Sequence, residues 1–368
     1  MLPFLVVAYD LSYTAAAALV FASNALSALV QPLFGYLGDK VDRPWFMSLG
    51  VMLSGGGVAA MGFCHSYWAI FCCAVTAGIG VALFHPEGGK LANVVAGANK
   101  GASISNFSVG GNLGFAIGPV ITTFALSAWG MQGTAILVVP AVAAAALLLS
   151  QTRAFHRMTA QEAERIAESS PAGQKDDWVG FSKVTSVNIA RAIIGNSLLT
   201  FIPLYWIAVL GQSHEFSALM ITVYSLGGAV ATFVGGRIAD RVGLKRMVLI
   251  SIGCVGPLLL AFLFMDQVIP ATVLLVLFAC MHSVGHAPMV ALGQAYLPNR
   301  IGFASGISLG VVVGMGGIAA PGIGAIGDVW GLQVSLAVVC AIAFVGLGIA
   351  SLLYTGRNAH ESIGAPPD

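Results

Sequence analysis

Long apolar segments recur along the whole chain and are separated by short polar connections. Each is about 20 residues or longer, the length that a helix needs to cross a hydrocarbon layer ~30 Å thick. Helix is the expected spanning element because its backbone groups are satisfied within the segment, and the short alternating pattern of a transmembrane β-barrel is absent. The pattern predicts eleven full spans, at residues 12–38, 45–63, 67–93, 100–128, 131–150, 187–210, 215–239, 245–265, 269–295, 302–328 and 331–354.

The central loop at about 151–186 is the only substantial polar segment outside these spans. Within it, "MTAQEAERIAESS" carries Ala, Glu and Arg at helical spacing, which predicts a short surface helix. We interpret this segment as a linker between two membrane halves, with lipid-surface binding as the alternative. The predicted organisation is a helical bundle at 1–150, a central loop at 151–186, a second bundle at 187–355 and a tail at 356–368.

Composition agrees with a membrane protein. The 368 residues are 58% hydrophobic and 8% charged, whereas a soluble domain carries roughly 25% charged residues. Such a chain cannot cover its surface with polar groups in water, so the bilayer is its expected solvent. The cysteines lie in or beside apolar segments without a C-x-x-C pair, so we expect small core residues, neither disulfides nor metal ligands. They are Cys64, Cys72, Cys73, Cys254, Cys280 and Cys340.

Lysine and arginine gather in alternate connections. The connections around Asp10, His65, Gln132, Glu215 and Asp266 hold none, and neither does the one around Asp328. Because basic residues mark the cytoplasmic side, the central loop and the tail are expected inside and the basic-free connections outside. The basic residues outside the central loop are Lys40, Arg43, Lys90, Lys100, Arg191, Arg237, Arg241, Lys245, Arg246, Arg300 and Arg357.

The two halves of the chain repeat each other. "GYLGDKVDRPW" at 35–45 aligns with "GRIADRVGLKR" at 236–246, and "GASISNFSVGGNLGFAIGP" at 101–119 aligns with "GFASGISLGVVVGMGGIAAP" at 302–321. The offset stays near 201, so two copies of one six-helix unit are expected. Only two residues precede Pro3, whereas the helix around its counterpart Pro203 extends back to about residue 184. We therefore expect part of the first helix to be missing here, with a genuine eleven-helix protein as the alternative.

The repeated polar loop resembles the signature loop of the major facilitator superfamily, G-x-L-x-D-[RK]-x-x-[RK]. Its aspartate stands at a helix end, where it can pair with a nearby cation or cap a neighbouring helix N-terminus. Such a contact can hold two halves together in one state and release them in another; the alternative is that the loop only fixes topology. The candidate gating residues are Gly35, Asp39, Lys40, Arg43, Gly236, Asp240, Arg241 and Arg246.

A second motif is rich in glycine and proline. "GGNLGFAIGP" at 110–119 partly resembles the Gly-x-x-x-Gly-Pro element of drug/proton antiporters, without that element's final glycine, and "GMGGIAAPGIG" mirrors it at 314–324. Glycines four residues apart let helix backbones approach closely. We expect helix packing, and a direct part in proton coupling is the alternative. The packing candidates are Gly110, Gly114, Gly118, Pro119, Gly316 and Pro321.

Most of the first half is similar to the fosmidomycin-resistance family within this superfamily. The resemblance rests on "LVFASNALSALVQPLFGYLGD" and on the stretch from "LFHPEGGKLA" through "SNFSVGGNLGFAIGP". It implies a bacterial inner-membrane exporter that expels a phosphonate antibiotic by drug/proton antiport. It also implies an all-α facilitator fold, here with an incomplete first helix, of two pseudo-symmetric six-helix bundles around a central cavity.

"FHPEGGKLA" places several polar groups inside an apolar span. Among the acidic residues, only Glu87 lies well inside a span, about 30 Å along a helix that begins near Tyr67. Glu87 and Lys90 share a helix face, while His85 points elsewhere. A carboxylate in such a place can exchange protons, and an anionic substrate could bind beside it; the alternative is a static pair with Lys90 reaching to water.

Further polar candidates lie in other spans. His282 and His286 are four residues apart, expected on one face of the span 269–295, either facing a pore or satisfied in the core; metal binding lacks a third ligand. Arg191 could hold a phosphonate by paired hydrogen bonds or anchor a helix at the interface. The remaining amides either bind substrate or join helices: Asn24, Gln31, Asn106, Asn112 and Asn196.

Motifs of soluble enzymes do not fit. The glycine clusters at 78–80 and 110–114 follow no strand, and "GGK" at 88–90 lacks the spacing of a P-loop. We expect no enzyme activity, no cofactor, no metal and no nucleic acid. The predicted function is proton-coupled efflux of a small drug-like or anionic compound by a monomer. The alternatives are proton- or ion-coupled uptake of a small metabolite, or a non-transporting receptor of the same fold.

Overall fold

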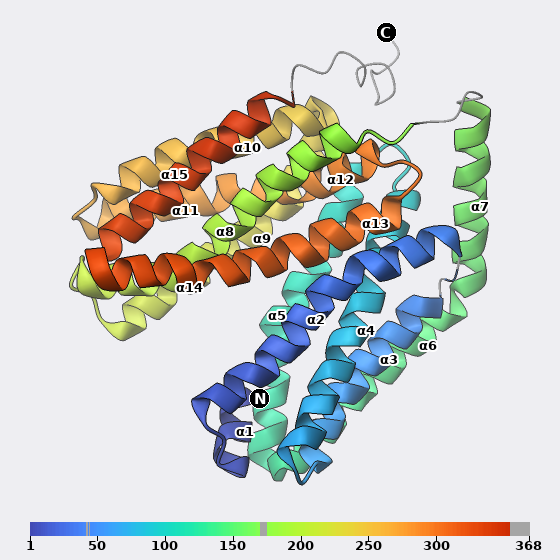
Figure 1. Ribbon diagram of the computed structural model, residues 1–368, viewed down its shortest axis with the longest axis horizontal. Helices are drawn as coiled ribbons and strands as arrows, with labels where there is room; N and C mark the ends of the chain where they lie inside the picture. The colour runs from blue at the N-terminus through green and yellow to red at the C-terminus, as the bar shows by residue number, and fades with distance from the viewer. Residues whose placement is uncertain (42, 44, 170–174, 354–368) are drawn as a thin grey trace. The chain divides into compact units, whose positions relative to one another are not determined.

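The computed structural model describes residues 1–41, 43, 45–169 and 175–353, and these residues form helices without any strand (Figure 1). The predicted tail at 356–368 lies outside the described residues. In chain order the helices are α1 (Leu2–Tyr9), α2 (Tyr13–Lys40), α3 (Trp45–Ala60), η1 (Met61–Phe63), α4 (Tyr67–Val94), α5 (Lys100–Trp129), η2 (Gly130–Leu137), α6 (Val138–Ser150), α7 (Thr152–Ser169), α8 (Trp178–Ala208), α9 (His214–Val242), α10 (Leu244–Leu263), α11 (Val268–Val284), α12 (His286–Tyr296), α13 (Ile301–Gly306), η3 (Ile307–Val311), α14 (Val312–Trp330) and α15 (Leu332–Ser351).

The prediction of an all-helical membrane fold is confirmed. Within the described residues, ten helical stretches are long and apolar enough to cross a membrane, and one of them, Lys100–Ser150, contains two predicted spans. The short surface helix predicted in the central loop is present as α7. The largest boundary difference is at α8, which begins at Trp178 where the sequence predicts 187. Asp177 caps this early start by accepting a hydrogen bond from the Gly180 amide at 2.8 Å.

Serine caps set several other helix starts. Ser12, Ser66 and Ser213 precede α2, α4 and α9, and each side chain accepts a hydrogen bond from the backbone amide three residues later. This contact satisfies one of the four amides that a helix N-terminus leaves without an intrahelical partner. Gly243 and Gly331, with φ of 96° and 91°, form the turns before α10 and α15, because glycine adopts such backbone angles without strain.

Two spans predicted as continuous helices are interrupted. The span at 269–295 breaks at Gly285 between α11 and α12. Pro288 lacks the amide that would bind the Val284 carbonyl, so the regular ladder cannot continue there. The span at 302–328 passes through the π-helical turn η3, with an α-helix on either side. Such single π-turns are frequent at functional positions in helices.

Spatial contacts divide the chain into two compact units. The first comprises Met1–Val95, Gly110–Asp176 and Pro298–Gly314; the second comprises Ala96–Val109, Asp177–Leu297 and Met315–Asp368. Each unit therefore contains a short helical segment from the opposite half of the sequence. The division at 150 and 187 that the repeat predicts stays a prediction.

Within the first unit, α2 and α3 pack on α4, and α6 packs on α3 (Figure 1). The second unit has a large apolar core that α8, α9, α10, α11, α14 and α15 build together. Tyr205 and Trp206 of α8 are fully buried in this core, and the Tyr205 hydroxyl donates to the Met265 carbonyl. The α8 segment that carries Arg191 is thus held against a well-packed surface.

Candidate functional site

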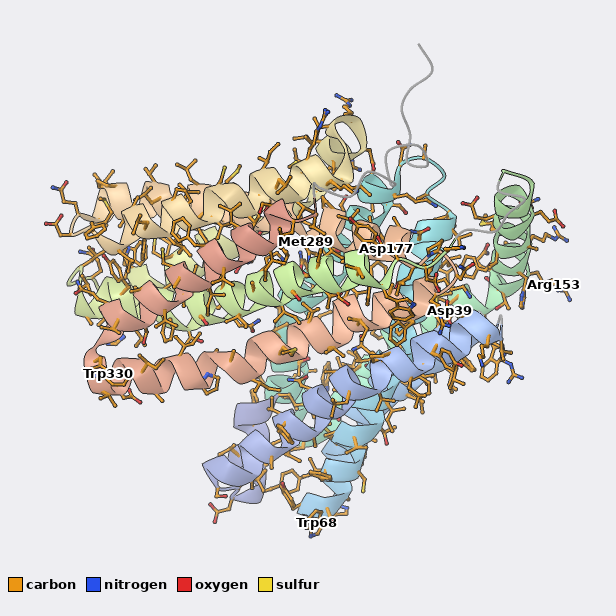
Figure 2. The ribbon with its side chains drawn as sticks, turned by 45° about the horizontal axis from the view of Figure 1, so that its top comes forward. Asp39, Trp68, Arg153, Asp177, Met289 and Trp330 are labelled. Atoms are coloured by element: carbon orange, nitrogen blue, oxygen red, sulfur yellow. The ribbon has the colours of Figure 1, made fainter. Side chains whose placement is uncertain are left out.

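The first repeated loop holds a helix N-terminus through Asp39, which lies near the end of α2 (Figure 2). The two carboxylate oxygens of Asp39 accept hydrogen bonds from the amides of Gly302 and Phe303 at 2.7 and 2.9 Å. These amides open α13. Lys90 and Arg300 are close enough to stabilise the negative charge of Asp39. Of the two roles that the sequence left open, capping a neighbouring helix and pairing directly with a cation, the structure has capping.

The second repeated loop makes the same contact. Asp240 of α9 accepts hydrogen bonds from the amides of Gly101 and Ala102 at 2.7 and 2.8 Å, and these amides lie at the start of α5. Asp39 and Asp240 are 201 positions apart, as are Gly101 and Gly302. Each aspartate therefore binds the helix that belongs, by the repeat, to the other half of the sequence. A carboxylate on helix-terminal amides is favoured by both charge and hydrogen bonding.

Glycine makes the close approach at these contacts possible. A Cβ added at Gly302 would lie 2.6 Å from the Gly35 carbonyl oxygen, and one added at Gly101 would lie 2.5 Å from that of Gly236. Any larger residue would push the helices apart and lengthen the aspartate contacts. The glycines of the signature thus have a structural reason in both copies.

The basic residues of the loops lie outside these contacts. Lys40 sits over the ring of Tyr36 with its ammonium 4.7 Å from the ring centre. Arg43, Arg241 and Arg246 are exposed side chains. Cations on such exposed helix ends interact weakly with any single partner in water.

Glu87 and Lys90 contact the helix end that carries the first aspartate. The Lys90 ammonium donates to the Gly38 carbonyl oxygen at 2.8 Å. Glu87 is buried, and its carboxylate occupies the space where a side chain at Gly38 would stand. Both residues line a small pocket with Phe155 and Thr159 of α7. The expected shared face of Glu87 and Lys90 is thus directed at α2 and α7.

His85 lies on the same helix but on another face. Its Nδ1 is 3.0 Å from the Val81 carbonyl oxygen. A carbonyl only accepts, so Nδ1 carries the proton in this contact. Because Val81 precedes His85 by one helical turn, this ring is anchored to its own helix.

The second unit gathers a cluster around Arg191 of α8. The guanidinium Nε donates to the Asn188 side-chain oxygen at 3.1 Å, and one terminal nitrogen donates to His286 Nδ1 at 2.9 Å. Nε2 of His282 is 3.0 Å from the backbone oxygen of Arg191. The two histidines that the sequence placed on one continuous helix therefore flank the break at Gly285, and both still contact Arg191.

The chemistry of these contacts fixes which of the contacting ring nitrogens carries a proton. A guanidinium can only donate, so Nδ1 of His286 must be an unprotonated acceptor. The carbonyl of Arg191 can only accept, so His282 donates from Nε2. Gly195 gives the His282 ring room, since a Cβ there would lie 2.9 Å from its Cε1 and 3.8 Å from the Tyr224 hydroxyl. Among the described residues, the Arg191 side chain thus donates to two neutral groups, Asn188 and His286.

The candidate amides have different surroundings. Asn196 donates to the Ala192 carbonyl oxygen at 2.9 Å, and Asn106 accepts from Arg237 at 3.0 Å. Gln31 is buried and donates to Ser27 at 3.2 Å. Asn24 and Asn112 are exposed. Only Asn196 belongs to the same helix as Arg191.

The two glycine and proline motifs differ in their packing. Gly316 packs on α8, where an added Cβ would lie 2.6 Å from the Ala192 carbonyl oxygen. A Cβ added at Gly110, Gly114 or Gly118 would meet no atom within 4 Å in the part of the chain that the structure describes. Within the described residues these three glycines of α5 therefore have no close neighbour, and the packing role of the first copy stays a prediction. Both motif prolines, Pro119 and Pro321, are exposed.

Some residues of these clusters were missed by sequence reasoning. Asn188 lies three positions before Arg191, so their shared helix face was a readable signal. Gly38, Gly195 and Tyr224 gave none, since their importance depends on neighbours distant in the chain. Among the described residues, no group of three or more His, Cys, Asp or Glu side chains is placed to hold a metal ion.

Two bacterial proteins are similar to this chain in sequence over nearly its whole length. The chain is 29% identical to an uncharacterized MFS-type transporter, YfnC of Bacillus subtilis (strain 168), over 98% of this chain and 89% of that one. It is 25% identical to the fosmidomycin resistance protein of Escherichia coli (strain K12), over 98% of this chain and 88% of that one.

Solved structures share the fold at low identity. A bacterial homologue of the iron transporter ferroportin has a TM-score of 0.74 at 14% identity, covering 96% of this chain and 93% of that one. The Escherichia coli fucose:proton symporter FucP has a TM-score of 0.67 at 14% identity, covering 92% and 91%. The family model of the Major Facilitator Superfamily matches residues 1–321 and again 184–367. The chain therefore belongs to the Major Facilitator Superfamily, and its fold is that of multi-pass membrane transporters.

Proposed function

We propose that the protein is a proton-coupled efflux transporter for a small anionic compound, and that it works by alternating access in a bacterial inner membrane. The similarity to the fosmidomycin resistance protein supports a phosphonate as substrate. In this proposal the monomer takes up the compound on the cytoplasmic side, releases it outside and returns with a proton. The central loop and the C-terminus are cytoplasmic.

The buried guanidinium of Arg191 is the observation that carries the proposal. Arg191 is 9% exposed, lies in a membrane-spanning helix and has only neutral hydrogen-bond partners among the described residues. A charge at that depth costs at least about 2.5 kcal/mol and is usually retained for a function. A guanidinium has five N–H donors, and two are used by Asn188 and His286. The remaining donors suit the paired oxygens of a phosphonate or carboxylate.

The proposal assigns the proton to Glu87. This carboxylate is buried against Gly38, and the next residue along α2 is the capping Asp39. A change of charge at Glu87 therefore acts on the helix end that carries the cap. Lys90 also connects Glu87 with Asp39, because it binds the Gly38 carbonyl and stabilises the charge of Asp39.

The two aspartate contacts are the proposed gate. Each joins helices that the repeat assigns to opposite halves, so both must open before the halves can separate at that side. Their loops carry basic residues, which supports a cytoplasmic position. Rocking of two repeats about a midplane site is the general mode of transport for such folds.

A second candidate is proton-coupled uptake, and the contact between Arg191 and His286 favours it. An anion that draws the guanidinium away frees Nδ1 of His286 to accept a proton, with His282 and Tyr224 as the other titratable groups beside the cluster. Attraction between the anion and the new positive charge would then make the two bind together. Cooperative binding is what symport needs, whereas antiport needs competition.

Drug tolerance of cells tests the proposed function. Cells that express the protein are expected to tolerate fosmidomycin, and Arg191→Gln should reduce tolerance to that of cells without it. Losing two charge-assisted hydrogen bonds corresponds to at least about 100-fold weaker binding. Arg153→Gln, at an exposed position of α7, is the matched control and should change nothing. Tolerance that survives Arg191→Gln at equal protein levels would refute the assignment of Arg191.

Glu87→Gln and pH-dependent binding separate the remaining roles. If Glu87 carries the proton, Glu87→Gln abolishes tolerance while the purified variant still binds fosmidomycin. Tolerance unaffected by that substitution would remove Glu87 from the mechanism. If the protein is an antiporter, the affinity of the wild type for fosmidomycin, measured by calorimetry, should fall as the pH is lowered. An affinity that rises instead supports uptake and opposes efflux.

A further inference from the structure

Two cysteine thiols meet at one end of the first unit. Cys64 follows η1, and Cys73 lies in the second turn of α4, nine positions later. Their sulfur atoms are 3.6 Å apart, and both side chains are half-buried. The third cysteine of this region, Cys72, is exposed and is adjacent to Cys73 in the helix.

Packing on both sides fixes this contact. The Tyr9 hydroxyl donates to the Cys64 carbonyl oxygen at 2.7 Å, and the Cys64 thiol is 3.4 Å from the Ala60 carbonyl oxygen. Cys64 and Cys73 both pack against a small apolar cluster of Leu5, Leu19, Met61, Ile70 and Ala74. The two thiols are therefore held near each other by neighbours, although they come from a connection and a helix.

Although the sequence favours no disulfide and both thiols are free in the structure, we propose that Cys64 and Cys73 are a redox-active dithiol that closes to a disulfide on the outer side of the membrane. A disulfide needs the sulfur atoms at about 2.0 Å, so from the present 3.6 Å they have to approach each other by roughly 1.6 Å. The connection around His65 carries no basic residue, which places it outside in the proposed topology. In bacteria, disulfides persist on that side and are reduced on the other.

The oxidation requires a partner disulfide, and thiol–disulfide exchange supplies it. The thiolate of Cys64 attacks one sulfur of the partner, forms a mixed disulfide and releases one partner thiolate. The thiolate of Cys73 then attacks the Cys64 sulfur and releases the second. Two cysteine thiols lose two protons and two electrons, and the partner disulfide becomes two thiols. In vitro, glutathione disulfide takes the part of the partner.

The bond would join the end of η1 directly to α4. It closes a loop of ten residues, counting both cysteines. Restricting such a loop lowers the entropy of the unfolded connection. The oxidised protein should therefore unfold at a higher temperature than the reduced one, independently of any transported compound.

Thiol counting and peptide mapping test the proposal on the purified full chain. Treatment with glutathione disulfide should lower the number of free thiols from six to four. Chymotrypsin cuts after Tyr67 and Phe71, between the two cysteines, so the bond would link two separate peptides. Cys72 and Cys73 stay in one peptide, so fragmentation of the linked peptides must assign the bond. Six remaining thiols, or a bond assigned to Cys72, would overturn the proposal.

Single variants make the assignment specific. Cys72→Ala should still lose two thiols on oxidation, whereas Cys64→Ala and Cys73→Ala should lose none. The rise in unfolding temperature on oxidation should also persist in Cys72→Ala and vanish in the other two. The wild-type peptide map remains decisive even where a variant folds poorly, and an unchanged rise in Cys73→Ala would contradict the proposed bond.

Discussion

Removing the Asp39 side chain should release the start of α13. Asp39→Ala deletes both hydrogen bonds to the amides of Gly302 and Phe303, which are 2.7 and 2.9 Å long. It also removes a negative charge from a helix N-terminus. Asp39→Asn keeps one acceptor oxygen and loses the charge, so it should lie between the wild type and the alanine variant.

The magnitude follows from these two contacts. A hydrogen bond to a charged group contributes about 1.5–3 kcal/mol, and water can replace part of it at a half-buried position. The net loss for Asp39→Ala should therefore be about 2–4 kcal/mol, including the smaller contribution of the helix dipole. At about 1.4 kcal/mol for each factor of ten, local opening becomes roughly 30- to 1,000-fold more frequent.

Amide hydrogen exchange measures this opening directly. In Asp39→Ala, exchange at the Gly302 and Phe303 amides should accelerate by that factor, while the amides of Gly101 and Ala102 keep their wild-type rates. Asp240→Ala should show the reverse pattern, because it makes the equivalent pair of bonds. The repeat thus provides a matched control within one molecule.

Two results would refute this reasoning. Unchanged exchange at Gly302 in Asp39→Ala would mean that the carboxylate does not hold the helix start. Equal acceleration at both helix starts in either variant would mean that the contacts do not act locally and that the variant loosens the whole protein.

Three glycine substitutions test close packing at other positions, and a fourth, Gly114→Ala, is their control. Gly38→Ala places a methyl 2.8 Å from a buried carboxyl carbon and should lower the unfolding temperature in detergent, whereas an unchanged temperature would contradict the described contact. Gly195→Ala should displace the His282 ring and weaken phosphonate binding in calorimetry; wild-type affinity would count against the cluster. Gly316→Ala should destabilise the protein, while Gly114→Ala should be neutral within about 1 kcal/mol because its Cβ enters open space.

Hydropathy predicted most helices of the fold, and the serine caps were a further signal that the sequence carried. Apolar length is a local property, and serine at positions 12, 66 and 213 marks helix starts in the sequence itself. The break after α11 was also readable, because Pro288 cannot bind the carbonyl four residues before it. The π-turn η3 was not. It lies where Gly306 and Gly310 approach Gln31 of α2, and that approach depends on tertiary packing.

The partners of the candidate site residues also depend on tertiary packing and could not be predicted from the sequence. The sequence indicated that Asp39 and Asp240 could cap a helix, but it could not identify the helices, since 263 and 139 positions separate the partners. Likewise, Arg191 and His286 were separate candidates until the fold brought them to 2.9 Å. Residue type and depth predict that a group needs a partner, whereas only the packed structure selects which one.

The central claim is that a buried arginine binds an anion that protons drive out of the cell. Everted membrane vesicles test it most directly, since export from cells becomes accumulation inside them. With an acidic lumen, wild-type vesicles should accumulate labelled fosmidomycin, Arg153→Gln vesicles should do the same, and Arg191→Gln vesicles should not. Accumulation that is absent in the wild type, or equal in the two variants, would contradict the claim.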